Sequence, residues 1–151
     1  MSQNMNMSPE QTVRQFIDAF RVSWPIDFDA ALAPLAEDAS YQIVVPTIAP
    51  IRGRATIKAE LLRMRTRVAD QKHVMKNVAA SGNVVFTERV DSSLRNGHWI
   101  EIPLVAVFEL NDRGQIAVWR EYLDLGHAAQ QHGMTFEALH QTLVQHTKAA
   151  A

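Results

Sequence analysis

Apolar residues in the first third of the chain recur at the spacing of helices. The segment Ser8-Pro9-Glu10-Gln11 has the form of a helix start, with an N-cap serine, a proline at the first helical position and a glutamine that completes a capping box. We expect Trp24-Pro25 to end this helix, and Asp27 to cap a short second helix before Pro34. Four apolar side chains form one face of the first helix: Val13, Phe16, Ile17 and Phe20.

A strand and a third helix are predicted next. Ser40 to Val45 has the composition of a strand that Pro46 closes, and Pro50 to Gly53 marks a turn. Residues Ala55 to Val68 then show a helical period, with a buried face formed by Ile57, Leu61, Met64 and Val68. The basic residues of this region are interpreted as a solvated face, with a phosphate-binding patch as the alternative: Arg52, Arg54, Lys58, Arg63, Arg65 and Arg67.

From Lys72 onward the period changes to that of strands. Turn residues separate the apolar runs, and Asn96-Gly97 in particular suits a tight hairpin. The predicted strands are Lys72 to Ala79, Val84 to Leu94, Trp99 to Leu110 and Gln115 to Leu125. Gly133 and Thr135 then precede a C-terminal helix, whose apolar side carries Phe136, Leu139 and Leu143. This order predicts an antiparallel meander followed by a helix.

Helices first and hairpin-linked strands afterwards indicate the α+β class. We expect a strongly curved, mostly antiparallel sheet wrapped around the N-terminal helices, with an internal apolar pocket between them. The length of 151 residues favours a single domain over residues 1–151. We expect the N-terminus to be flexible over residues 1–7 and the C-terminus to fray over residues 146–151.

The composition narrows the classes of function. Lys and Arg total 15 against 16 Asp and Glu, so the formal charge of -1 provides no overall field for nucleic acid or an anionic membrane. The absence of cysteine excludes disulfides, thiolate nucleophiles and sulfur-ligated zinc. No apolar run approaches the roughly 18 residues of a membrane span, and Met1 to Ser8 does not read as a signal peptide. We therefore expect a cytoplasmic protein without nucleic-acid or membrane partners.

Alternation along the strands places several ionisable groups on common faces. Arg89 and Asp91 share one face of their strand, and Glu121 shares a face with Trp119 and Leu123. The strand between them has a wholly apolar face, formed by Ile102, Leu104, Ala106 and Phe108. If these faces turn inward, two carboxyl groups and one guanidinium meet beside an apolar wall. The commoner alternative for such a pattern is that Arg89 and Asp91 are surface partners.

Two buried carboxyl groups bridged by an arginine would be able to handle a proton. A planar guanidinium can hydrogen-bond both acids at once. Desolvation and like-charge repulsion then favour one ionised and one protonated carboxyl group. A proton donor and a proton acceptor would coexist near neutral pH, which is what general acid–base catalysis requires.

Two segments carry a resemblance to a known family. Val85 to Asp91 and Trp119 to Asp124 resemble the two signature strands of limonene-1,2-epoxide hydrolases, and the run Thr-Glu-Arg-Val-Asp is the strongest match. The resemblance extends loosely from the first helix to about Leu125. It implies a cone-shaped α+β fold of the kind shared with ketosteroid isomerases, nuclear transport factor proteins and SnoaL-like proteins.

The resemblance also implies an activity and the residues for it. The chain would add water to a small, largely apolar epoxide and give a vicinal diol, with no covalent intermediate, metal or cofactor. Asp91 would be the acid, Arg89 the bridge and Glu121 the base, while Tyr41 would hold the attacking water. The remaining substrate-binding residues would be Trp119, Ile102, Leu104 and Leu123. For Tyr41 and Trp119, ordinary packing in the core is the alternative.

Three positions depart from the family's pattern. Glu121 stands where the family usually has Asp, Ile43 where it has a water-holding Asn, and Leu123 where an aromatic residue is common. Two other functions therefore stay open. One is an isomerase or cyclase of the same fold that uses the same acid–base pocket, and the other is a non-catalytic, small-molecule-binding dimeric module.

Partners and metals follow from the same reasoning. The family's dimers imply a homodimer through the outer face of the sheet, with Arg120, Tyr122 and Asp124 at the interface. The histidines of the C-terminal region lack the spacing that a metal site requires, and no metal is expected: His127, His132, His140 and His146.

Overall fold

A six-stranded sheet organises the protein, in the strand order β2-β1-β6-β5-β4-β3. The structure, a computed structural model, describes residues 7–22 and 26–150. Neighbouring strands of the sheet are antiparallel except β1 and β6, which run parallel. The strands are β1 (Leu35–Gln42), β2 (Ile51–Arg52), β3 (Asp70–Ser81), β4 (Val84–Arg95), β5 (His98–Leu110) and β6 (Ile116–Leu123).

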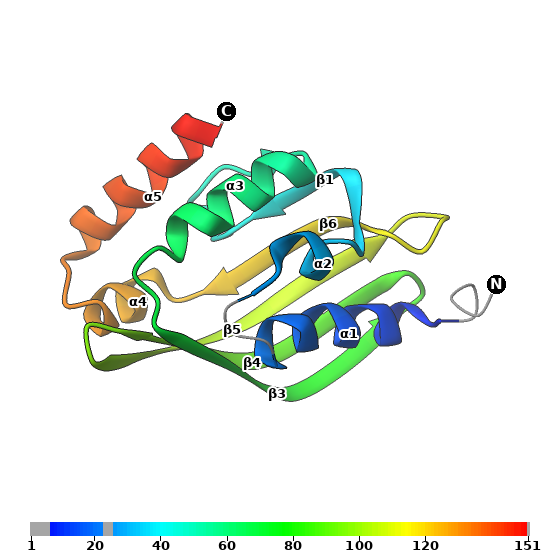
Figure 1. The fold of residues 1–151 in the computed structure, drawn as a ribbon, viewed down its shortest axis with the longest axis horizontal. Helices are drawn as coiled ribbons and strands as arrows, with labels where there is room; N and C mark the ends of the chain where they lie inside the picture. The colour runs from blue at the N-terminus through cyan, green and yellow to red at the C-terminus, as the bar shows by residue number, and fades with distance from the viewer. Residues whose placement is uncertain (1–6, 23–25, 151) are drawn as a thin grey trace.

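Helices lie along one face of the sheet and at one of its ends (Figure 1). Helix α1 packs against β3 and β4, and α3 packs against β1. At the end where β4 turns into β5, α4 contacts β5, and α5 contacts both α3 and α4. The helices are α1 (Pro9–Val22), α2 (Phe28–Ala31), α3 (Arg54–Met64), α4 (Leu125–Gln131) and α5 (Phe136–Ala150). The expected α+β class with a curved, mostly antiparallel sheet is confirmed.

The predicted helix starts are confirmed by their caps. The backbone N–H of Gln11 donates to Ser8 Oγ at 3.1 Å, and the backbone N–H of Ser8 donates to Gln11 Oε1 at 2.8 Å, which is a complete capping box. Asp27 Oδ1 accepts a hydrogen bond from the backbone N–H of Ala30 at 3.2 Å and caps α2. The expected helix end at Trp24-Pro25 lies outside the described residues, and α1 is described as far as Val22.

The predicted meander is also confirmed. The four expected strands correspond to β3, β4, β5 and β6, with ends that differ by at most two residues. In the hairpin between β4 and β5, Asn96 and Gly97 have φ values of 50° and 79°. These left-handed conformations suit the right-handed twist of the flanking strands, which is why Asn-Gly is favoured in such turns.

Three element boundaries differ from the sequence-based expectations. The strand expected over Ser40 to Val45 starts five residues earlier and ends at Gln42. It begins with Leu35, which pairs with β6, but its first residues show no clear alternation of apolar and polar side chains by which the pattern would have revealed them. The helix expected to reach Val68 ends at Met64. Helix α4 was not predicted: the side chain of Asp124 accepts from the backbone N–H of His127 at 3.1 Å and starts a helix where alternation suggested more strand.

Two apolar clusters divide the interior. The larger one lies between the sheet and α1 to α3, where the ring of Phe16 makes edge contacts with the rings of Phe108 and Trp119. The smaller one lies at the α4–α5 end and contains Val44 and Leu125. Three half-buried residues pack against both clusters: Ile43, Ile102 and Leu123. The space between the two clusters is where the candidate site is found.

The structure describes the two ends of the chain to different extents. Helix α5 continues to Ala150, and the fraying expected over residues 146–151 stays a prediction. Residues 1–6 of the expected flexible N-terminus lie outside the described part of the chain. Within the described helices, none combines the length and apolarity that a membrane crossing demands.

Candidate active site

Arg89 bridges two carboxyl groups in the interior. Its Nε and Nη2 donate to Asp91 Oδ1 and Oδ2 at 2.8 and 3.2 Å, and Nη2 also donates to Glu121 Oε2 at 2.7 Å. Nη1 donates to Thr87 Oγ1 at 2.8 Å, so the guanidinium is held from both sides. The Arg89 side chain is 2% exposed. The structure therefore brings together the three residues that alternation and the resemblance had selected, and they are not surface partners.

The strand register explains how Arg89 reaches Glu121. The two residues lie on β4 and β6, which are separated by β5 and so stand about 10 Å apart. Ala106 of β5 lies directly between Thr87 and Glu121 in the register. Because alanine has a short side chain, the long Arg89 side chain can cross β5 at this level.

Glu121 accepts hydrogen bonds from two further side chains. The hydroxyl of Tyr41 donates to Oε1 at 3.1 Å, and the indole N–H of Trp119 donates to Oε2 at 3.2 Å. Tyr41 lies opposite Trp119 in the parallel β1–β6 register, and the two rings stack with their centroids 3.9 Å apart. Both rings therefore pack in the core and also hold the Glu121 carboxyl group in a fixed orientation.

His73 is a member of this cluster that sequence reasoning missed. It lies directly opposite Asp91 in the β3–β4 register, and its Nδ1 is 2.7 Å from Asp91 Oδ1. Its side chain is 8% exposed, and its Nε2 is buried without a hydrogen-bond partner in the described structure. The expected hairpin register could have found this contact, since residues opposite each other on a sheet face are neighbours.

The interpretation of the basic residues around α3 as a solvated face is wrong for Arg65. This residue follows the last turn of α3, and its Nε donates to Gln71 Oε1 at 3.1 Å. Gln71 is buried and donates in turn to the backbone carbonyl of Phe20 at 2.5 Å. The guanidinium of Arg65 lies 5.7 Å from the Phe20 ring centroid and lines the same cavity as Asp91. Burial lowers its pKa, with Tyr41 and Glu121 acting against this.

The two carboxyl groups differ in their affinity for a proton. Burial favours the neutral form of Asp91, but Arg89 and His73 outweigh it and hold the pKa of Asp91 below its ordinary value. Burial raises the pKa of Glu121, and Asp91 adds to this although Arg89 opposes it. Burial and Glu121 also raise the pKa of Tyr41, which keeps its hydroxyl a neutral donor. Glu121 therefore holds a proton more tightly than Asp91 does.

A cavity of about 190 Å³ adjoins the two carboxyl groups. Of the expected site residues, Tyr41, Asp91, Glu121 and the aliphatic residues Ile102, Leu104 and Leu123 line it. Trp119 and Arg89 line instead a smaller hollow of about 40 Å³ behind it, which Tyr41, Asp91 and Glu121 share. Ile43, at the position of the missing asparagine, also borders the larger cavity. Among the described residues, no group of three or more histidines and carboxylates is arranged to hold a metal ion.

Solved structures with a similar fold include one epoxide hydrolase and proteins of other descriptions. A Mycobacterium tuberculosis LEH-like epoxide hydrolase is 29% identical, with a TM-score of 0.69 over 82% of this chain and 87% of that one. A putative SnoaL-like polyketide cyclase from Shewanella denitrificans has a TM-score of 0.72 at 15% identity, over 83% and 96% of the two chains. A protein with a ketosteroid isomerase-like fold from Catenulispora acidiphila has a TM-score of 0.70 at 18% identity, over 87% and 98%. The latter two likenesses concern the fold alone.

Sequence comparison is more specific. The epoxide hydrolase EphG of Mycobacterium tuberculosis is 33% identical over 99 residues, which is 66% of this chain and 64% of EphG. The match thus spans less than two thirds of that relative's length. The family model described as the limonene-1,2-epoxide hydrolase catalytic domain matches residues 7–132, which contain every residue of the cluster around Arg89. The chain belongs to the limonene-1,2-epoxide hydrolase family.

Proposed function

We propose that this protein hydrolyses a small, largely apolar epoxide to a vicinal diol by one-step general acid–base catalysis. The observation that carries the proposal is the double hydrogen bonding of Arg89 to Asp91 and Glu121 beside a cavity with aliphatic walls. Such a pair can hold one proton between two acids, and the apolar wall excludes bulk water from the reacting atoms. Membership of the family supports the same activity.

The proposed step involves two proton transfers, one from Asp91 to the substrate and one from the attacking water to Glu121. Asp91 in its protonated form gives its proton to the epoxide oxygen as the carbon–oxygen bond breaks. A water molecule forms the new carbon–oxygen bond and loses a proton to Glu121, and Arg89 stays charged between the two acids. After the step the proton is on Glu121, whose pKa is raised, and Asp91, whose pKa is lowered, is ionised. A proton must therefore return from Glu121 to Asp91 before each turnover.

The proposed position of the attacking water is beside the Tyr41 hydroxyl and Glu121 Oε1. These two groups are already hydrogen-bonded to each other at 3.1 Å and border the cavity, so a water there would meet both. The aliphatic side chain of Ile43 offers no second anchor. This last feature also favours an isomerase or cyclase as a second candidate, because a proton shuttle between two carbon atoms of one substrate needs no bound water.

Mass spectrometry in isotopically labelled water tests the proposal. A panel of small epoxides should give diols that contain one labelled oxygen atom, in the absence of any added metal or cofactor. A product with the mass of the substrate would support the isomerase or cyclase instead. If no compound of the panel is converted although an apolar ligand binds, the protein is a binding module and the proposal is wrong.

The rate should have a bell-shaped dependence on pH. Activity needs one proton on the pair, so kcat/KM should fall when both carboxyl groups are protonated and again when both are ionised. Because the pKa of Asp91 is lowered, the acid limb should lie below the ordinary aspartate range, and because that of Glu121 is raised, the alkaline limb should lie above the ordinary glutamate range. Initial rates of diol formation measure both limbs, and two limbs at ordinary carboxyl values would contradict this assignment.

A homodimer through the outer face of the sheet is proposed as well. This face exposes large apolar side chains, among them Phe86 at 42%, Val105 at 39% and Tyr122 at 43%. Such an apolar surface is favoured as a contact between subunits. Val105→Lys should then convert dimer to monomer in sedimentation velocity, whereas Leu62→Lys, at an exposed site on α3, should not. An unchanged mass for Val105→Lys would place the contact elsewhere.

The cytoplasmic location stays a prediction.

A further inference from the structure

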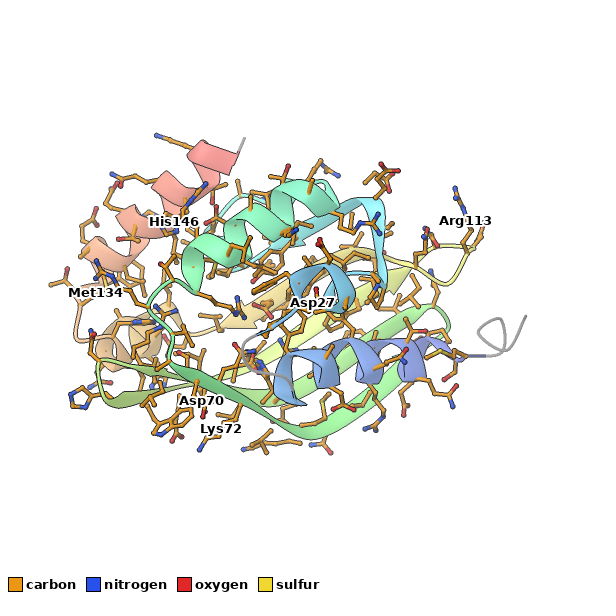
Figure 2. The ribbon with its side chains drawn as sticks, viewed as in Figure 1. Asp27, Asp70, Lys72, Arg113, Met134 and His146 are labelled. Atoms are coloured by element: carbon orange, nitrogen blue, oxygen red, sulfur yellow. The ribbon has the colours of Figure 1, made fainter. Side chains whose placement is uncertain are left out.

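The catalytic cavity continues into a larger groove at the α4–α5 end of the molecule. This groove has a volume of about 740 Å³ and lies between the end of α3, the β4–β5 hairpin and the α4–α5 turn. Figure 2 labels two of its lining residues, Met134 at the α4–α5 turn and His146 on α5. Six residues line both the groove and the catalytic cavity: Met64, Arg95, Ile100, His132, Leu139 and Leu143. A ligand in the cavity can therefore extend into the groove.

The groove carries a local excess of positive charge. Its charged and titratable lining residues are three arginines and three histidines: Arg63, Arg67, Arg95, His98, His132 and His146. No aspartate or glutamate of the described chain is among its lining residues. The whole chain, by contrast, has 15 Lys and Arg against 16 Asp and Glu. The positive groove is thus a feature of the fold and not of the composition.

Arg95 and Arg67 are the cations of the groove that lack a counter-charge. Arg63 forms an ion pair with Glu60 at 2.8 Å, and His146 Nδ1 lies 3.2 Å from the same carboxyl group. Within the described structure, no carboxylate lies within 4.0 Å of Arg67 or Arg95. Burial lowers the pKa of Arg95, and the like charges of Arg65 and Arg67 add to this. An anion bound here would relieve that repulsion.

The Arg95 side chain is held in place while part of it stays available. Its Nη2 donates to the backbone carbonyl of Met64 at 2.9 Å, and its Nε donates to Ser93 Oγ at 3.3 Å. Its Nη1 has no acceptor among the described residues. An arginine fixed in this way loses little conformational freedom when it binds an anion, and its planar group suits a carboxylate.

The strand register sets the distance between this charge and the catalytic pair. Asp91, Ser93 and Arg95 alternate on one face of β4, so Arg95 lies about 13 Å along the strand from Asp91. Ile102 and Ile100 of β5 lie opposite Asp91 and Ser93 and line the path between the two ends. The site thus has a reactive end, an apolar middle and a cationic end.

We propose that the substrate is an epoxide with an apolar chain that ends in a carboxylate, and that Arg95 and Arg67 bind this carboxylate at the mouth of the catalytic cavity. This inference rests on the proposed hydrolysis and specifies its substrate class. An epoxide of a medium-chain fatty acid has the required chemistry: it places its epoxide beside Asp91, its chain against Ile100 and Ile102, and its acid group in the groove.

Three substrates with the same epoxide and chain separate the contributions of charge and apolar contact. They are a medium-chain fatty acid with a terminal epoxide, its methyl ester and its analogue with a trimethylammonium end group. The acid should have the highest kcat/KM, on the order of tenfold to a hundredfold above the ester, because charge-assisted hydrogen bonds are strong. The cationic analogue should be the poorest. Added salt should reduce the differences in kcat/KM among the three substrates, since the groove is open to solvent.

Variants of the groove arginines show which side chain causes the preference for the acid over the ester. Arg95→Gln should lower kcat/KM much more for the acid than for the ester, so that most of the preference for the acid is lost, and Arg95→Lys should keep part of this preference. Arg67→Gln should cause a smaller loss. Arg113→Gln is the matched control, because Arg113 lies at the β5–β6 turn far from Met134 and His146 (Figure 2). Equal kcat/KM values for acid and ester, or equal losses for both in Arg95→Gln, would overturn the proposal.

Binding measurements separate failure of this proposal from failure of the proposed hydrolysis. If neither acid nor ester is converted, the hydrolase assignment fails, but calorimetric titration of the unchanged protein and of Arg95→Gln with the same two compounds still tests the groove. Tighter binding of the acid that is lost in Arg95→Gln supports the anion site, and equal affinities refute it. If added acetate raises kcat/KM for the ester to that for the acid, the groove takes an independent anion and the substrate assignment is wrong.

Discussion

Asp91→Asn is expected to reduce diol formation on the order of a thousandfold, the largest effect of any single carboxyl change in this protein. Asparagine keeps the shape of the side chain and can still accept a hydrogen bond from Arg89 Nε, which now binds Asp91 Oδ1 at 2.8 Å. The fold should therefore survive, as circular dichroism and thermal unfolding can verify. What is lost is the proton that the proposed step takes from Asp91.

The pH dependence of the residual activity identifies the role of the remaining carboxyl group. With Asp91 replaced, Glu121 titrates alone, so kcat/KM should rise with pH through its pKa if Glu121 is the base. A rate that falls with increasing pH would make Glu121 the acid and would reverse the two proposed roles. Glu37→Gln, which changes an exposed carboxyl group of β1, is the control and should leave the rate within a factor of about two.

Arg89→Met should abolish activity and lower the free energy of unfolding by about 3–5 kcal/mol at neutral pH. The variant leaves two carboxyl groups in the interior without the guanidinium that binds both of them at 2.8 and 2.7 Å. Methionine keeps much of the length of the side chain but provides no donor. Urea denaturation measures the loss, and Arg14→Met, which breaks the exposed pair with Glu10 on α1, should cost less than about 1 kcal/mol.

This loss of stability should diminish as the pH falls. Arg89 opposes the effect of burial on both carboxyl groups, so without it the folded protein binds protons more tightly than the unfolded chain and gains stability with decreasing pH. The unchanged protein shows the opposite trend through Asp91, because a lowered pKa contributes stability that disappears as the pH falls through it. The two unfolding free energies should therefore approach each other as the pH falls from neutral towards and below the ordinary carboxyl range. A triple variant that combines Arg89→Met with Asp91→Asn and Glu121→Gln removes the uncompensated charges. If it is no more stable than Arg89→Met alone, lost packing and not uncompensated charge explains the lower free energy of unfolding.

The sequence by itself determined the local elements and the facing of side chains within each strand. The capping box at Ser8 and the Asn96-Gly97 hairpin were predictable because their hydrogen bonds and backbone angles depend on neighbouring residues alone. The common orientation of Arg89 and Asp91 was predictable because the pleat of a strand turns every second side chain the same way. The choice of Glu121 as their partner came from the family resemblance as well as from alternation.

Only the tertiary structure decided which of these faces meet and what else joins them. His73 contacts Asp91 through the β3–β4 register, and Arg65 enters the cavity although its position on a basic helix suggested solvent. Trp119 borders the inner hollow and orients Glu121 without lining the larger cavity. Helix periodicity and strand alternation specify directions relative to one element, whereas burial depends on which distant elements pack against it. The positive groove follows from the same cause, because it combines the end of α3, one hairpin and the α4–α5 turn, which only the folded chain brings together.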